Sequence, residues 1–193
     1  MAKAKSITGL KRQAPTAVNA RIIASTRLDE LYSWEAYVDD PYKIDELHNL
    51  RIAAKRLRYT LEIFADVLPE ACEPLRQEVE QIQEELGAMH DSDVLIALLR
   101  LCLGSHDSGS GYTYLLARAT RLRAKGNYVV NPELMAHLLD PGVTPSAEQR
   151  QGLELLLRDL QKRREEQYRA FRQHWHQLHY RDFRKELLAV LHS

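Results

Sequence analysis

The stretch His48-Asn-Leu-Arg51-Ile-Ala-Ala-Lys55-Arg56-Leu-Arg58-Tyr59 combines a helical apolar repeat with basic residues and contains no acidic residue. Apolar residues in and around it recur at alternating spacings of three and four, which predicts one buried face of a long helix. These residues are Leu47, Leu50, Ala54, Leu57, Leu61, Phe64 and Leu68. Four basic residues each follow one of these positions and therefore run along one flank of the helix. They are His48, Arg51, Lys55 and Arg58, and we call them the basic row.

The basic row has the spacing expected of a site for a linear polyanion. At about 1.5 Å per helical residue, the four side chains are distributed over roughly 15 Å. Arginine presents a planar fork of donors that matches phosphate oxygens, and lysine presents a compact charge. Ile52, Tyr59 and Ile63 lie beyond the row, on the side away from the buried face, so the row runs between two apolar surfaces. This placement predicts that the row lines a groove or an interface.

The rest of the chain also reads as helix. Apolar periodicity predicts helices over residues 16–39, 40–68, 74–102, 112–125, 146–178 and 180–191. Asp40-Pro41 is expected to open the second of these, and Ser146 with Gln149 forms a predicted capping box before the fifth. Short loops between long amphipathic helices predict an all-α fold, an antiparallel four-helix bundle with short additional helices. We expect residues 1–15 to be a flexible N-terminal segment and residues 16–193 to form one helical domain.

Charge is balanced overall but unevenly distributed. The 193 residues carry no formal net charge, so no global field favours nucleic acid as a partner. Residues 51–58 carry only positive charge, whereas residues 62–93 contain ten acidic residues against one arginine, Arg76. Pairing between acidic and basic helices would explain part of this segregation. The sequence shows no signal peptide and no apolar stretch near the roughly 20 residues of a membrane span, so we expect a cytoplasmic protein.

Two arginines occupy positions where the heptad pattern calls for an apolar side chain. They are Arg27 in the first predicted helix and Arg164 in the long C-terminal one. Because burying an unpaired guanidinium is prohibitive, each must pair with a carboxylate or face a wet, anion-filled cavity. Asp91, Asp93 and Glu62 are the expected carboxylate partners. The mid-helix positions of both arginines also suggest one shared polar site.

Two other functions are compatible with the residues. His48, His90-Asp91 and Asp140 follow the order of ligands in HD-type metal phosphohydrolases, which gives an enzyme alternative using His48, His90 and Asp91. The match is short, and Asp140 falls in a segment rich in Pro and Gly. We instead expect Asp91 and Asp93 to cap the second half of their helix and to orient residues of the basic row. We expect no catalytic residue, metal or cofactor. The other alternative is a helical scaffold whose basic face binds an acidic protein or nucleic acid.

Two motifs resemble the CHAD family, the conserved histidine α-helical domain. The first is His48-x-x-Arg51-Ile-x-x-Lys55-Arg56-Leu-Arg58-Tyr59, and the second is Leu86-Gly-x-x-His90-Asp91-x-Asp93-Val94-Leu95. The resemblance covers most of residues 16–191 and implies an all-helical module that binds inorganic polyphosphate through basic residues lining a groove or pore, without catalysis. By motif position, the residues that carry over are His48, Arg51, Lys55, Arg56 and Arg58. Arg27 and Arg164 join them from the core-position argument.

The chain departs from the family pattern in one respect. A typical member contains two such bundles, each with its own histidine–arginine motif, whereas one motif is found here. Either two copies pair as a homodimer, which the apolar row of Ile52, Tyr59 and Ile63 favours, or the chain works as a single shallow site. The expected partners are therefore inorganic polyphosphate and a second copy, with no membrane and no nucleic acid. The resemblance also implies association with polyphosphate granules.

Overall fold

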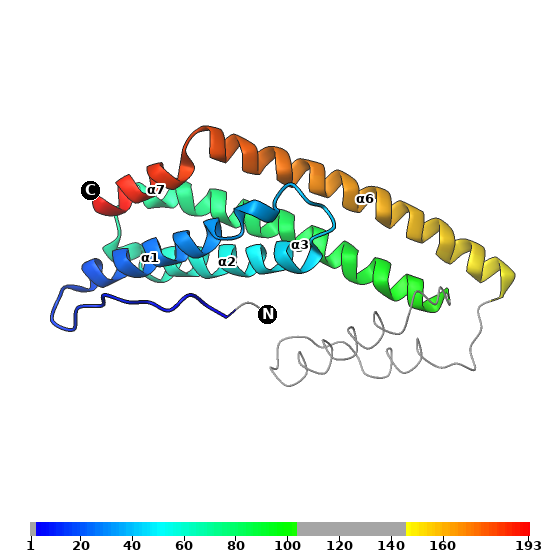
Figure 1. Ribbon diagram of the computed structural model, residues 1–193, viewed down its shortest axis with the longest axis horizontal. Helices are drawn as coiled ribbons and strands as arrows, with labels where there is room; N and C mark the ends of the chain where they lie inside the picture. The colour runs from blue at the N-terminus through cyan, green and yellow to red at the C-terminus, as the bar shows by residue number, and fades with distance from the viewer. Residues whose placement is uncertain (1–2, 104–145) are drawn as a thin grey trace. The chain divides into compact units, whose positions relative to one another are not determined.

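The computed structural model describes residues 3–103 and 146–193, and these residues form helices and no strand (Figure 1). The helices are α1 (Thr16–Tyr32), α2 (Ile44–Ile63), α3 (Cys72–Cys102), α6 (Ala147–Tyr180) and α7 (Phe183–His192), with 3-10 turns at Glu35–Tyr37 and Ala65–Val67. The predicted all-α class is confirmed, and the four-helix arrangement stays a prediction. The helix predicted at 112–125 lies outside the described residues. Within the described ranges, no helix is both long and apolar enough to cross a membrane.

The chain divides into two compact units. The first comprises Met1–Asp91 with Arg164–Ser193, and the second comprises Ser92–Arg163. The first unit therefore contains α1, α2, α7, the first part of α3 and the second part of α6. The first motif of the sequence analysis lies in this unit, and the second motif begins in it.

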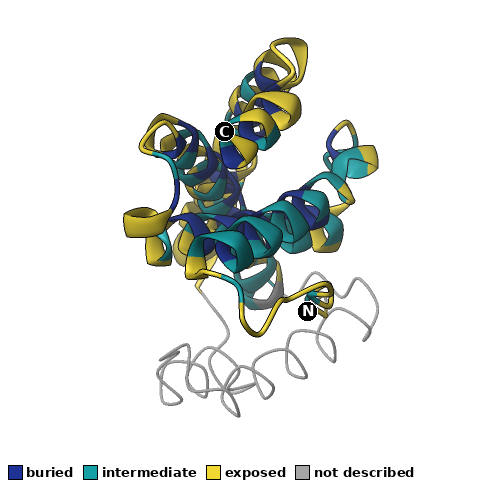
Figure 2. Ribbon diagram, turned by 90° about the vertical axis from the view of Figure 1, so that its left-hand side faces the viewer, coloured by how far each residue is buried: buried dark blue, intermediate teal, exposed yellow. Residues whose placement is uncertain are grey.

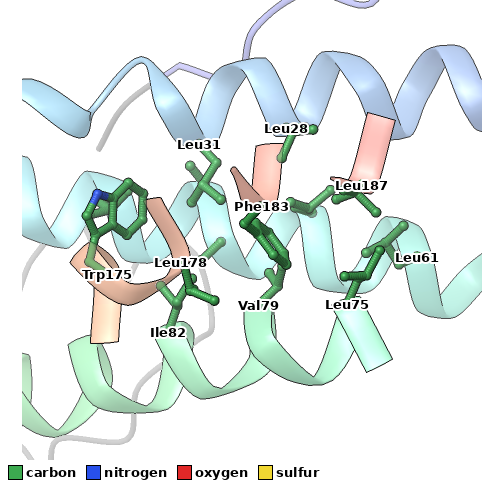
Figure 3. Close-up of a cluster of buried hydrophobic side chains, with 14 of the residues drawn as sticks. Leu28, Leu31, Leu61, Leu75, Val79, Ile82, Trp175, Leu178, Phe183 and Leu187 are labelled. Atoms are coloured by element: carbon green, nitrogen blue, oxygen red, sulfur yellow. The ribbon is translucent and has the colours of Figure 1, made fainter. Parts of the chain in front are cut away.

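The core of the first unit is built from all five of its helices. The predicted buried face of α2 is confirmed, because Leu47, Leu50, Ala54, Leu57, Leu61 and Leu68 are buried and Phe64 is half-buried. Figure 3 shows this core, with Leu28 of α1, Val79 of α3, Trp175 of α6 and Phe183 of α7 pointing toward one another. Burial of each such side chain contributes on the order of 2 kcal/mol. The buried faces of these helices turn inward and their exposed faces outward (Figure 2).

Several helix ends differ from the predictions, for local reasons. The first helix ends at Tyr32 rather than near residue 39. The second helix begins at Ile44, because Asp40 accepts a hydrogen bond from the Tyr42 N–H at 2.9 Å and so forms an Asx turn rather than a helix cap. The same helix ends at Ile63. Leu68 is extended (φ −92°, ψ 158°), as expected of a residue before proline.

The later helices follow the sequence more closely. Ser146 and Gln149 form the predicted capping box, in which the Ser146 N–H donates to Gln149 Oε1 at 2.9 Å and the Gln149 N–H donates to Ser146 Oγ at 3.2 Å. α3 continues through Gly87 to Cys102. The prediction that Asp91 and Asp93 cap a second half of this helix was therefore wrong, since both lie in its interior.

The N-terminal segment that the sequence analysis assigned to residues 1–15 contacts α1. Asn19 accepts a hydrogen bond from the Lys11 N–H at 2.8 Å and donates to the Lys11 carbonyl at 2.9 Å. Closer to the N-terminus, Lys5 lies 3.8 Å from Asp29, and its carbonyl accepts a hydrogen bond from Arg27 at 3.0 Å. These contacts place the segment alongside α1.

Candidate anion-binding site

The basic row lies along the face of α2 that meets α3. Three pairs define how the two helices align: His48 with His90, Arg51 with Gly87, and Arg58 with Glu80. Each step forward along α2 is matched by an equal step backward along α3, so the two helices run antiparallel. The His48 and His90 ring centroids are 4.4 Å apart. This alignment brings the two sequence motifs into one contact.

Arg51 lies against a position on α3 that has no side chain. A Cβ placed on Gly87 would be 3.4 Å from Arg51 Nε and 3.8 Å from Nη2. The Nε atom is buried, and no hydrogen-bond partner for it exists in the part of the chain that the structure describes. A buried donor without an acceptor is costly, but Arg51 as a whole is only half-buried, so part of its side chain stays accessible to an anion. Arg51 is therefore well placed to take an external anion.

Lys55 lies one turn further along the row. It is half-buried and makes no ion pair with residues 3–103 or 146–193, and its Nζ atom lies 5.5 Å from the centre of the Tyr59 ring. By the register of the two helices, the position facing it on α3 is Gln83. The Gln83 Oε1 atom is also buried and without a hydrogen-bond partner among the described residues. Lys55 thus adds a second cation that no carboxylate neutralises in this part of the chain.

Arg58, at the end of the row, is neutralised within the protein. Its Nη1 atom donates to Glu80 Oε1 at 2.8 Å, and its guanidinium lies 4.4 Å from the centre of the Tyr59 ring. Arg76 of α3 donates to the other oxygen of Glu80, also at 2.8 Å. The pKa of Glu80 lies below its ordinary value, mainly because of the hydrogen bond from Arg76, with Arg58 adding to the effect. Along the row, Arg51 and Lys55 have no carboxylate partner among the described residues, whereas Arg58 is bound to one.

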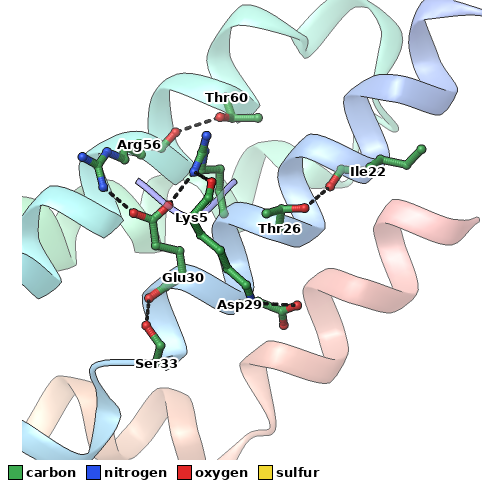
Figure 4. A network of polar contacts seen from close by, with 9 residues as sticks. Lys5, Ile22, Thr26, Asp29, Glu30, Ser33, Arg56 and Thr60 are labelled. Carbon is green, nitrogen blue, oxygen red and sulfur yellow. Dashed lines mark hydrogen bonds and ion pairs between the residues drawn. The ribbon is translucent and has the colours of Figure 1, made fainter. Parts of the chain in front are cut away.

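Arg27 and Arg56 meet at a buried carboxylate, Glu30. Figure 4 shows the contact between Arg56 and Glu30. Arg27 donates to Glu30 Oε2 at 2.6 Å, and Arg56 donates to Glu30 Oε1. Glu30 is only 4% exposed, and two guanidinium groups share its single charge. The carboxylate partners predicted for Arg27, which were Asp91, Asp93 and Glu62, were wrong. The sequence analysis missed Glu30. Its position three residues after Arg27 on the same helix could have indicated this ion pair.

Arg164 contacts the segment between α1 and α2. It donates to the Pro41 carbonyl at 2.8 Å and lies 5.6 Å from the ring centre of Tyr168. The Tyr168 hydroxyl in turn donates to the Val38 carbonyl at 3.0 Å. Arg27 and Arg164, which were expected to share one polar site, therefore contact different partners.

The CHAD domain family model matches residues 4–100 of the chain, which is just over half of its length. This chain belongs to the CHAD family. The matched region contains α1, α2 and nearly all of α3, and so includes both motifs and the whole basic row. No curated protein and no solved structure matches the chain.

The CHAD motifs bring together two histidines that the enzyme alternative had named. His48 and His90 are adjacent, but no group of three His, Cys, Asp or Glu side chains suited to a metal occurs within the described ranges. Asp140, the remaining ligand of that alternative, lies outside the described residues. Asp91 follows His90 and is exposed.

Acidic residues on α3 of this CHAD domain also pair with residues of α6 and of the turn after it. The individual pairs were not predicted from the sequence. His174 lies between two glutamates, with Nδ1 2.9 Å from Glu85 Oε2 and Nε2 3.0 Å from Glu78 Oε2. Arg181 donates to the other oxygen of Glu78 at 2.8 Å. The hydrogen bond with Glu85, and then that with Glu78, raises the pKa of His174 against the opposing effect of burial. Pairing between acidic and basic helices therefore accounts for part of the charge segregation, but within residues 3–103 and 146–193 it leaves Arg51 and Lys55 without carboxylates.

Proposed function

We propose that this chain binds inorganic polyphosphate without covalent chemistry, through the basic row on an antiparallel four-helix bundle. The observation that carries the proposal is the pair Arg51 and Lys55, one turn apart on α2, neither of which has a carboxylate partner among the described residues. Membership of the CHAD family, a family of polyphosphate-binding domains, supports the same conclusion. The space above Gly87 supports it further, because it admits the Arg51 guanidinium between the helices.

Binding would depend on several phosphates at once. Arg51 and Lys55 would contact neighbouring phosphates of one chain, and His48 would donate to a phosphate oxygen one turn earlier. Each added contact raises the local concentration of the next phosphate, so affinity should increase with chain length. Because each contact releases counterions, affinity should fall steeply with salt, by analogy with other polyanions.

The remaining predicted site residues would act at longer range. Arg27 and Arg56 both contact Glu30, and their guanidinium groups would act on a bound chain through the potential around α2. Arg164 would act in the same way from beside the start of α2. Arg58 would join the site only if its bond to Glu80 opens.

We further propose that two copies associate through the apolar row beside the basic row. Tyr59 is 41% exposed and Ile63 is 74% exposed, which leaves apolar surface next to Lys55 and Arg58. A twofold contact there would place two basic rows around one phosphate chain and so complete the site. Within the cell, such a protein would be found with polyphosphate in the cytoplasm.

The double substitution Arg51→Ala with Lys55→Ala tests the proposed function. We expect it to abolish retention of long-chain polyphosphate while circular dichroism shows unchanged helicity, since neither side chain forms an ion pair with a described carboxylate. Arg158→Ala with Lys162→Ala is the matched control, because these α6 residues have the same types and spacing and are exposed. Binding by the first variant that equals binding by the control would refute the proposal.

A further inference from the structure

We infer that a phosphate group of a bound chain replaces Glu80 between Arg58 and Arg76, so that Arg76 belongs to the binding site and Glu80 limits its affinity. The inference rests on the proposed function and adds two residues to it. It arises from the position of the Glu80 carboxylate, which two arginines from two helices hold by its two oxygens.

The geometry of this contact is that of an anion site occupied by a side chain. Arg58 of α2 donates to Glu80 Oε1 at 2.8 Å, and Arg76 of α3 donates to Glu80 Oε2 at 2.8 Å. A phosphate also offers two oxygens to two guanidinium groups, and it carries at least as much charge as a carboxylate. The two arginines are thus already arranged around an anion.

This anion site continues the basic row. The Tyr59 ring lies 5.5 Å from Lys55 Nζ and 4.4 Å from the Arg58 guanidinium, so one aromatic ring contacts both cations. A chain bound at Arg51 and Lys55 would extend toward Arg58 without changing direction. The Glu80 side chain is 32% exposed, whereas Glu30, which holds the other arginine pair, is 5% exposed. Glu80 can therefore leave its partners for water, and Glu30 cannot.

Local charge explains why a short ligand would not displace Glu80. Glu73 holds Arg76 through two hydrogen bonds of 2.7 and 2.8 Å, and Glu62 lies 3.9 Å from Arg58. Glu73 keeps Arg76 in place when Glu80 moves, and both carboxylates weaken the attraction for a free anion. A phosphate tethered by Arg51 and Lys55 reaches the site at a high effective concentration, which a separate small anion does not have. Glu80 should therefore affect long chains and not short ones.

Glu80→Gln in the full chain tests the inference, with the dissociation constants of long-chain polyphosphate and of triphosphate as readouts. Gln retains the size of the side chain and removes its charge. We expect affinity for the long chain to rise about fivefold, which corresponds to the upper end of the free energy of one partly exposed ion pair. Affinity for triphosphate should change less than about twofold. Glu84→Gln is the matched control, since it removes the same charge from an exposed position on the next turn of α3. Equal affinities in the two variants would overturn the inference.

Arg76→Gln tests the same inference by removing one of the two arginines around the anion. It decides the inference if Glu80→Gln does not fold. We expect long-chain binding to weaken about fivefold, with triphosphate binding retained, relative to Arg163→Gln at an exposed position of α6. Long-chain affinity equal to that of the Arg163 variant would contradict the inference. The proposed function fails separately, when the Arg51 and Lys55 double variant still binds. If that variant loses binding while the Glu80 and Arg76 variants match their controls, the proposed function stands and this inference falls.

Discussion

The Arg51 guanidinium lies over Gly87, so that a Cβ on the glycine would be 3.4 Å from Arg51 Nε. The glycine of the second CHAD motif thus gives space to the arginine of the first. His48 and His90 make a second contact of the same kind one turn away, with ring centroids 4.4 Å apart. The two motifs are separated in sequence because they belong to different helices, and they lie in contact because those helices run antiparallel.

Substitutions at Gly87 should separate its effect on the helix from its effect on Arg51. In Gly87→Ala the new methyl group makes an ordinary contact with Arg51, and the loss of a mid-helix glycine stabilises the fold by up to about 1 kcal/mol. We expect a higher Tm and unchanged polyphosphate affinity. In Gly87→Leu the larger side chain occupies the place of the guanidinium, so affinity should fall nearly as far as in Arg51→Ala. Full binding by the Leu variant would show that the position of Arg51 does not matter.

Glu30 should be important for stability rather than for binding. Glu30→Gln removes the negative charge that Arg27 and Arg56 share and leaves both partly buried guanidinium groups without this ion pair. We expect a loss of about 2–3 kcal/mol in the free energy of unfolding, below the usual value for a fully buried pair because both arginines reach solvent. Denaturant unfolding of this variant beside Glu84→Gln measures it. A loss no greater than that of the Glu84 variant would mean that the buried triad adds no stability.

The contact of His174 with Glu85 and Glu78 should make stability depend on pH. Because the folded pKa of His174 is raised, the stabilisation is fully present below its unfolded pKa, about 6.5, and is lost as pH rises through the folded pKa. His174→Gln should therefore lower the Tm clearly at about pH 6 and only slightly at about pH 9. The exposed His192, at the end of α7, provides the control variant His192→Gln. The same loss of Tm at both pH values would show that the charge on His174 does not contribute.

Periodicity made the buried face of α2 predictable, because a residue such as Leu57 must face the core whatever the neighbouring helices are. The end of α1 and the start of α2 were harder to predict, since the side chain of Asp40 can either cap a helix or form an Asx turn. Glu80 could not be assigned to Arg58 from sequence, because that contact depends on the register between two helices. Glu30 lay within reach of sequence reasoning, but a carboxylate on a mostly apolar face was not considered as a partner for Arg27.

The most direct test of the central claim is a set of binding isotherms for orthophosphate, triphosphate and long-chain polyphosphate, each measured over a range of salt. If Arg51 and Lys55 bind successive phosphates, affinity per molecule should rise steeply from the first ligand to the third. The affinity for the long chain should also fall with salt with a logarithmic slope of at least about two, one for each unpaired cation. Equal affinities for the three ligands, or a long-chain affinity independent of salt, would contradict the account.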